Sequence, residues 1–384
     1  MPKAAKKPTQ KALRAARALE HVPHPGLKFS HKHYVFITRA KSGELWALNQ
    51  LSVEARSAVT PLLEVVAPAP PQKDKSGKLK PAKTVSQHAK DVLQVIKDEW
   101  SMLPVFIDTR YLRTGGVPSA TAAKVVFDIA RSLQLQAVPV TALTLSPEFQ
   151  TQIRDIAGTD KRGVVIRLSP ADFKQPDLLQ RYLSALLQVL QAPAEQVDIV
   201  IDLQKQTEQF IAQQAGISTL GRLPFLDQWR TVTLAAGCFP ESISRWRHDI
   251  WLPIERLDWL AWLEVISAQG NAGFRVPSYG DYGIRSGGEP LHIPNLPDPN
   301  IRYSTSDKVL VRKGAKEDGK IKEICTSLIQ MPEFSTAAFS SGDKEIAARA
   351  ARPGSPNNGQ PTQWIQWCTN HHLELTASQI RKLP

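Results

Sequence analysis

The sequence predicts an α/β protein built as a (β/α)8 barrel of the TIM type. From residue 33 onward, short apolar runs typical of strands alternate with longer segments whose apolar residues recur at three- and four-residue spacings. There are eight strand-like runs within about 250 residues, which is the size of a closed barrel. We expect these strands at 33–38, 61–66, 104–109, 137–142, 163–168, 198–203, 231–235 and 273–277.

The segments between the strands have the amphipathic pattern of helices that cover a barrel. We expect helices at 43–59, 85–100, 121–134, 147–157, 176–191 and 257–269. An open doubly wound sheet is the competing architecture. The first strand of such a sheet commonly leads into a Gly-rich phosphate turn, but here it runs into RAKSGE at 39–44. The barrel is therefore the favoured fold.

The regions outside the barrel have a different composition. Residues 1–30 are predicted to form a disordered basic tail, and residues 31–289 the barrel. Four prolines, at positions 290, 294, 297 and 299, interrupt the alternation, so 290–384 is expected to be an appended capping subdomain. A tryptophan-rich stretch at 246–262 is expected to be helical, packed on the outer face of the barrel or meeting a partner.

The positive charge is concentrated in two segments. Of a formal net charge of +12, residues 1–20 contribute +5 and a Lys/Pro-rich loop at 69–86 contributes +4. The remainder of the chain is close to neutral. Such segments can lie along a phosphate backbone, although solubility alone explains them as well. The lysines that we expect to contact nucleic acid are Lys73, Lys75, Lys78 and Lys80.

Several classes of protein are disfavoured by the composition. No apolar run reaches the length of a membrane-spanning helix, and the N-terminus lacks the apolar stretch of a secretory signal. We therefore expect a cytoplasmic protein without a membrane partner. The three cysteines, Cys238, Cys325 and Cys368, are widely spaced and form no zinc-binding pattern.

Charged residues at the ends of the predicted strands indicate a site at the barrel mouth. Because the carboxyl ends of parallel strands converge there, Glu64, Asp108 and Asp202 should lie close together and act as catalytic groups. Their hard oxygen ligands would suit a divalent metal such as magnesium. The residues expected to bind substrate on these strands and their loops are Lys41, Arg110, Arg167 and Gln204. An internal ring of salt bridges explains the same mixture of acids and bases.

The motif YGDY at 279–282 follows the last predicted strand and reads as a tight turn. We expect Asp281 to join the catalytic carboxylates and Tyr279 and Tyr282 to contact substrate at the same mouth. Turn chemistry alone also accounts for Gly280 and Asp281.

Several segments together resemble a known family. They are HYVFITRAKSGELWALNQLSVEARSAVTPLLEVV at 33–66, LPVFIDTRYL at 103–112, VDIVIDLQ at 197–204, AAGCFPES at 235–242, YGDYG at 279–283, and FSSGDKEIAARA and GQPTQWIQWCTNHHL near the C-terminus. In combination they are similar to the beta protein family of phages, satellite phages and bacteria. That resemblance implies a role in phage defence or toxin control, with no catalytic residues to carry over.

Three functional hypotheses follow from these observations. The first is a component of a phage or bacterial defence or toxin-control cassette that acts through a protein partner encoded nearby, with nucleic-acid contact as an additional feature. The second is a metal-dependent phosphodiester or nucleotide hydrolase with its site at the barrel mouth. The third is a non-specific nucleic-acid-binding protein. The fold alone does not decide among them.

Overall fold

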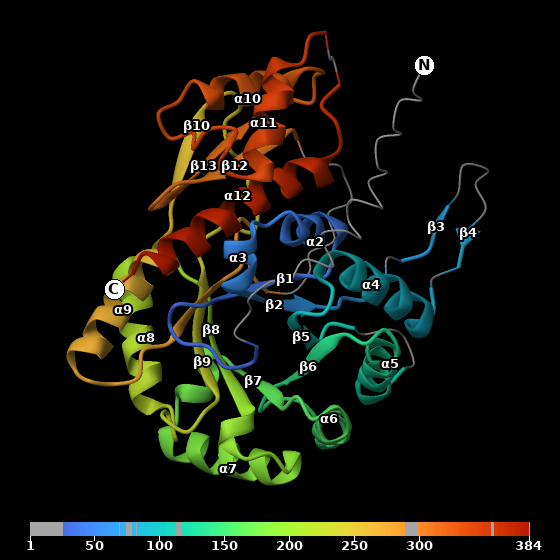
Figure 1. Cartoon of the computed structure of the whole chain (residues 1–384), viewed down its shortest axis with the longest axis vertical. Coiled ribbons are helices and arrows are strands. Elements are labelled where there is room, and N and C mark those ends of the chain that lie inside the picture. Colours follow the sequence, from blue (N-terminus) through green and yellow to red (C-terminus); the bar gives the residue numbers. More distant parts are fainter. Residues whose placement is uncertain are drawn as a thin grey trace, which may run out of the picture.

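The computed structural model describes residues 26–68, 70–73, 79–81, 83–112, 117–288, 298–354 and 357–383. Its centre is a closed barrel of eight parallel strands surrounded by helices, which confirms the predicted fold class (Figure 1). The strands are β1 (Tyr34–Arg39), β2 (Val59–Glu64), β5 (Pro104–Asp108), β6 (Gln136–Thr141), β7 (Val164–Leu168), β8 (Val197–Lys205), β9 (Thr231–Gly237) and β11 (Ser278–Asp281). The barrel closes because β1 pairs in parallel with both β2 and β11.

Alternation along the strands separates two cores. One set of side chains points into the barrel and includes Ile37, Leu62 and Phe106, all of which are fully buried. The alternate set packs outward against the helices and forms the larger core. Polar side chains cap the apolar interior at the carboxyl end of the strands, and these side chains form the mouth described below.

The helices cover the barrel largely as the sequence predicts. They are α2 (Ser42–Asn49), α3 (Val53–Ser57), α4 (Val85–Trp100), α5 (Ser119–Ser132), α6 (Pro147–Asp160), α7 (Pro176–Leu190), α8 (Gln209–Arg222) and α9 (Leu257–Asn271). The single helix expected at 43–59 is two helices, because the Ser52 hydroxyl accepts from the Ala55 amide and caps a new start. Helix α8 was not predicted from the sequence.

The eighth strand lies further along the chain than predicted. We expected it at 273–277 and a turn at 279–282, but β11 spans Ser278–Asp281 and pairs with β1 and β9. Packing explains the difference. A Cβ atom at Gly280 would lie 2.8 Å from the Cβ of Ala235 on β9, so the glycine permits close approach inside the barrel rather than a turn.

The C-terminal region folds around a second sheet and a second core. Its elements are β10 (Trp251–Glu255), β12 (Asn300–Ser304), β13 (Lys308–Lys313), α10 (Lys320–Ile329), α11 (Ser341–Ala351) and α12 (Pro361–Arg381). The middle of the tryptophan-rich stretch was expected to be helical, but it forms β10 and pairs antiparallel with β13. The chain therefore leaves the barrel after β9, adds a strand to the C-terminal sheet, and returns through α9.

Helix α12 joins the two parts of the molecule. Trp364 and Trp367 near its start belong to the C-terminal core, whereas Leu373, Ala377 and Ile380 belong to the core outside the barrel. Figure 1 shows this helix crossing between the C-terminal sheet and the barrel. The Ser52 hydroxyl donates to Glu374 at 2.9 Å and adds a polar tie between α12 and the barrel helices.

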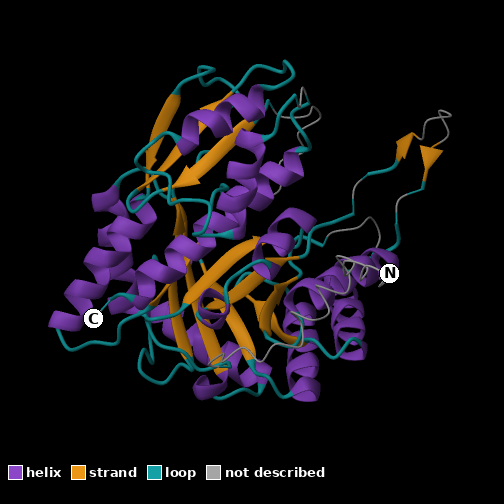
Figure 2. Ribbon diagram, turned by 45° about the horizontal axis from the view of Figure 1, so that its top comes forward, coloured by secondary structure: helices purple, strands orange, loops and turns teal. Residues whose placement is uncertain are grey.

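The described part of the Lys/Pro-rich loop is a small hairpin. Strands β3 (Gln72–Lys73) and β4 (Leu79–Lys80) form an antiparallel ladder that projects from the barrel (Figure 2). Lys75 and Lys78 lie outside the described residues, as does the predicted tail up to residue 25. Within the described part of the chain, no helix combines the length and apolar character needed to cross a membrane.

A candidate anion-binding pocket at the barrel mouth

Arg167 stands at the centre of the mouth and is bound on several sides by carboxylates. It projects inward from β7, and only 3% of its side chain is exposed. Its Nη1 donates to Glu64 at 2.8 Å and to Asp108 at 3.0 Å. Its Nε and Nη2 both donate to Asp202 Oδ2, at 3.0 and 2.8 Å. Tyr282 completes the cluster by donating to the same Asp202 oxygen at 2.6 Å.

The three predicted metal ligands therefore converge as expected, but on a guanidinium group. Arg167 occupies the space between their oxygens that a cation would need. Within the described residues, no group of three or more His, Cys, Asp or Glu side chains is arranged to hold a metal ion. The residues present do not fit magnesium, and the alternative of an internal salt-bridge ring describes this geometry.

The carboxylates in the ring differ in their electrostatics. Burial pushes the pKa of Asp108 upward, but Arg110 and Arg167 outweigh it and hold that pKa below its usual value. Arg110 Nε lies 2.7 Å from Asp108. Burial raises the pKa of Glu64, and the nearby Asp108 and Asp202 add to the rise against the pull of Arg167. Burial thus outweighs the ion pair with Arg167 at Glu64, whereas the two arginines outweigh burial at Asp108.

Asp281 and Tyr279 lie apart from the mouth. The alternation that points Tyr282 inward points these two side chains outward, toward α9 and α12. Asp281 accepts hydrogen bonds from Tyr279 at 2.9 Å, from Tyr34, and from His372 of α12 at 2.9 Å. The predicted catalytic Asp281 is therefore part of the buried contact between the barrel and the C-terminal region.

Lys41 and Gln204 are at the rim. Lys41 is exposed. Its pKa is lowered by partial desolvation and by repulsion from the neighbouring Arg285 and Arg39. The Gln204 amide N–H donates to Asp202 at 2.9 Å from a left-handed backbone conformation with φ of 60°, and its side chain is exposed.

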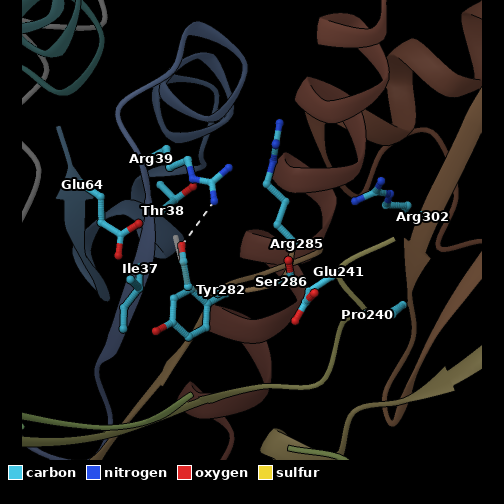
Figure 3. Close-up of a pocket in the computed structure, with 12 residues that line it drawn as sticks. Ile37, Thr38, Arg39, Glu64, Pro240, Glu241, Tyr282, Arg285, Ser286 and Arg302 are labelled. Atoms are coloured by element: carbon cyan, nitrogen blue, oxygen red, sulfur yellow. Dashed lines mark hydrogen bonds between the residues drawn. The ribbon is translucent and has the colours of Figure 1, made fainter. Parts of the chain in front are cut away.

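A pocket of about 310 Å³ opens above the Arg167 ring, between the barrel mouth and the C-terminal sheet (Figure 3). Its walls come from β1, β2 and β12 and from the loops after β9 and β11, which are the seventh and eighth barrel strands. The lining residues are Ile37, Thr38, Arg39, Glu64, Pro240, Glu241, Tyr282, Arg285, Ser286, Gly287, Gly288 and Arg302. Many (β/α)8 proteins bind phosphate with the loops after these two strands.

Three arginines face this pocket, and they are paired differently. Arg285 lies 2.5 Å from the buried Glu44 and is neutralised by it. Arg39 donates to the Gly288 carbonyl at 3.3 Å. Arg302 donates to the Ile284 carbonyl at 2.8 Å and lies 4.5 Å from the ring centroid of Phe239. Among the described residues, neither Arg39 nor Arg302 forms an ion pair.

The surroundings disfavour the charge on these unpaired arginines. Burial, followed by repulsion from Arg285, lowers the pKa of Arg302 to about 10. Burial also lowers the pKa of Arg39, although Glu64 acts in the opposite direction. Positive charges that are desolvated and lack a carboxylate partner are stabilised when an anion binds beside them.

The glycines of the loop after β11 shape the floor of the pocket. A Cβ atom at Gly287 would lie 2.5 Å from the ring of Tyr282, and Gly288 has a φ of +94°. Arg285, the Ser286–Gly288 loop and Arg302 were not predicted from the sequence. The motif IRSGG directly after YGDYG was the available signal for the loop, whereas Arg302 comes from the C-terminal sheet and has no such signal.

Comparisons with known proteins place the chain in a family. Residues 34–377 match the family model described as Beta protein. The chain belongs to the beta protein family. A search of curated proteins finds no match.

Several solved structures are similar at low identity. A type I 3-dehydroquinate dehydratase from Clostridium difficile is 11% identical, with a TM-score of 0.38 over 70% of this chain and 91% of that one. The carboxyl transferase domain of Rhizobium etli pyruvate carboxylase is also 11% identical, with a TM-score of 0.35 over 100% of this chain and 54% of that one. These values are too low to indicate a shared reaction.

Proposed function

We propose that this beta-family protein binds a phosphate-bearing small molecule in the mouth pocket. The observation that carries the proposal is Arg302, a guanidinium whose side-chain partners among the described residues are a carbonyl, an amide oxygen and an aromatic ring. An anion supplied by a ligand would provide the missing counter-charge. Arg39 faces the same space and also lacks a carboxylate partner within the described residues.

The kind of anion follows from the position and type of these groups. Guanidinium groups match phosphate through paired N–H donors, and the loops after the seventh and eighth strands are the usual phosphate site of this fold. The Gly287–Gly288 pair lets the backbone approach a ligand without a side chain intervening. The position of the pocket, the type of its donors and the shape of the loop thus all support a phosphate group as the anion.

The ligand site also bears on the three sequence hypotheses. A metal-dependent hydrolase loses support because the ring of Arg167 engages Glu64, Asp108 and Asp202. The first hypothesis remains our proposal for the cellular role: a defence or toxin-control component that acts through a protein partner. Within that role, we propose that the pocket binds a small phosphorylated molecule and that the protein partner distinguishes the ligand-bound form from the free form.

Titration calorimetry with inorganic phosphate tests the ligand site. Arg302→Met should weaken binding by roughly 10- to 150-fold, because a hydrogen bond to a charged group contributes about 1.5–3 kcal/mol. Arg154→Met is the matched control, since Arg154 pairs with Asp155 on the surface of α6, and it should bind like the unaltered protein. Absence of phosphate binding by the unaltered protein, or equal binding by Arg302→Met, would overturn the proposal.

A further inference from the structure

The mouth pocket has two chemically different ends. Figure 3 shows Glu64 and Arg302 on opposite sides of it, with Arg39 and Tyr282 between them. At the Arg302 end, Arg302 offers guanidinium donors beside the exposed carboxylate of Glu241, which also lines the pocket, whereas the opposite end carries the buried carboxylate of Glu64. A ligand that fits both ends has an anionic group at one end and hydrogen-bond donors at the other.

Glu64 retains the capacity to bind a ligand despite its role in the ring. Its side chain is 3% exposed, and its Oε1 accepts from Arg167 at 2.8 Å. A carboxylate has about four lone-pair sites, so one bond from Arg167 leaves Glu64 able to accept others. Because an ionised carboxylate accepts but does not donate, the group that meets it must carry an N–H or O–H.

Charge and size narrow the ligand further. Asp108 and Asp202 lie behind Glu64 around Arg167, so a second anionic group at this end would be repelled. A volume of about 310 Å³ is at the lower end of the range for small-molecule sites and is much larger than one phosphate needs. The organic part of the ligand must therefore be uncharged or cationic, compact and rich in donors.

Building on the proposed function, we propose that the ligand is a sugar monophosphate, either free or as part of a nucleoside monophosphate, whose sugar hydroxyls donate to Glu64. The phosphate lies between Arg39 and Arg302, and the sugar lies against Glu64 and Tyr282. Glu64 is then the residue that distinguishes a phosphorylated sugar from phosphate itself.

Calorimetry with four probes separates this inference from the proposed function. Ribose 5-phosphate should bind the unaltered protein roughly tenfold more tightly than inorganic phosphate or n-butyl phosphate, because the sugar hydroxyls add bonds that the alkyl ester lacks. Adenosine monophosphate distinguishes the two sources of the sugar: tighter binding than ribose 5-phosphate assigns a nucleotide, and weaker binding assigns a free sugar phosphate. Either result supports the proposal if the preference over n-butyl phosphate holds.

Glu64→Gln tests the residue itself. The variant should lose most of the preference for ribose 5-phosphate while binding inorganic phosphate at least as well, and its thermal unfolding reports whether the ring persists. Phosphate binding without a preference for the hydroxylated ester in the unaltered protein would overturn this inference and leave the proposed function standing. Failure of all four probes would overturn both. The comparison of the two esters needs no variant, so it holds even if Glu64→Gln does not fold.

Discussion

Two arginines at the same mouth have opposite surroundings. Arg167 is buried among Glu64, Asp108 and Asp202, all within 3.0 Å of its nitrogens. Arg302, on the other side of the pocket, is bound by neutral oxygens and lies over Phe239. Arg167 is buried and Arg302 is half-buried, and among the described residues only the first has carboxylates in ion pairs with it.

This contrast distinguishes an arginine that stabilises the fold, Arg167, from an arginine that is available to bind a ligand, Arg302. The fold supplies the counter-charge of Arg167, so removing that residue leaves buried carboxylates without a partner. For Arg302 the described residues supply no carboxylate in an ion pair, and the more distant Glu44 offsets its charge only in part, so its removal breaks no ion pair. A partly buried charge that forms no ion pair among the described residues is therefore the better indicator of a ligand than a dense cluster of charges.

The largest expected effect comes from breaking the Arg167 ring. Arg167→Met should lower the free energy of unfolding by about 3–5 kcal/mol, because it leaves several carboxylates buried and uncompensated. Urea unfolding followed by circular dichroism measures the loss. Arg302→Met is the comparison within the same pocket, and its unfolding free energy should fall by much less, because it loses hydrogen bonds to neutral oxygens but breaks no ion pair. Equal losses for the two variants would refute the distinction between them.

An intermediate effect should follow from the Asp281 cluster, which joins the barrel to α12. Asp281→Asn should cost about 1–3 kcal/mol, because an amide oxygen cannot satisfy Tyr34, Tyr279, His372 and the Gly283 amide together. Ribose 5-phosphate and phosphate affinity should be unchanged, since this cluster points away from the mouth.

Asp155→Asn on the exposed surface of α6 is the control, and its unfolding free energy should change little. Loss of phosphate binding in a folded Asp281→Asn protein would mean that the outward cluster also serves the pocket.

Much of the barrel could be predicted from sequence because its signal is local. Apolar runs bounded by turns mark most of the strands, and the charges at strand ends such as Asp108 and Arg167 stand out against those runs. The eighth strand was misplaced because Ser-Tyr-Gly-Asp has the composition of a turn. The need for Gly280 becomes visible only when β9 is placed beside it.

The site was harder to predict than the fold because the role of each charged residue depends on contacts with residues that are distant in the sequence. Glu64, Asp108 and Asp202 were expected together, and they are, yet the sequence could not tell whether a metal or Arg167 lies between them. Arg302 reaches the pocket from the C-terminal sheet, so no spacing rule connects it with Arg39. Its position depends on how β12 packs against the barrel.

The smallest expected effect sharpens the contrast within the Arg167 ring itself. The pKa of Glu64 is raised in the folded protein, so Glu64 binds a proton more tightly in the folded state than in the unfolded state. That contribution to stability is present below the unfolded pKa and is lost as pH rises through the folded value. The pKa of Asp108 is lowered, so its contribution is present above the unfolded pKa and is lost as pH falls through the folded value.

Glu64→Gln and Asp108→Asn should therefore alter the pH dependence of unfolding in opposite directions. Relative to the unaltered protein, Glu64→Gln should gain stability as pH rises from 4 to 7, and Asp108→Asn should lose stability over the same range. Urea titrations at several pH values measure both slopes. Parallel slopes would mean that Arg167 offsets the two acids equally. Opposite slopes would mean that burial outweighs Arg167 at Glu64, whereas Arg110 and Arg167 outweigh burial at Asp108.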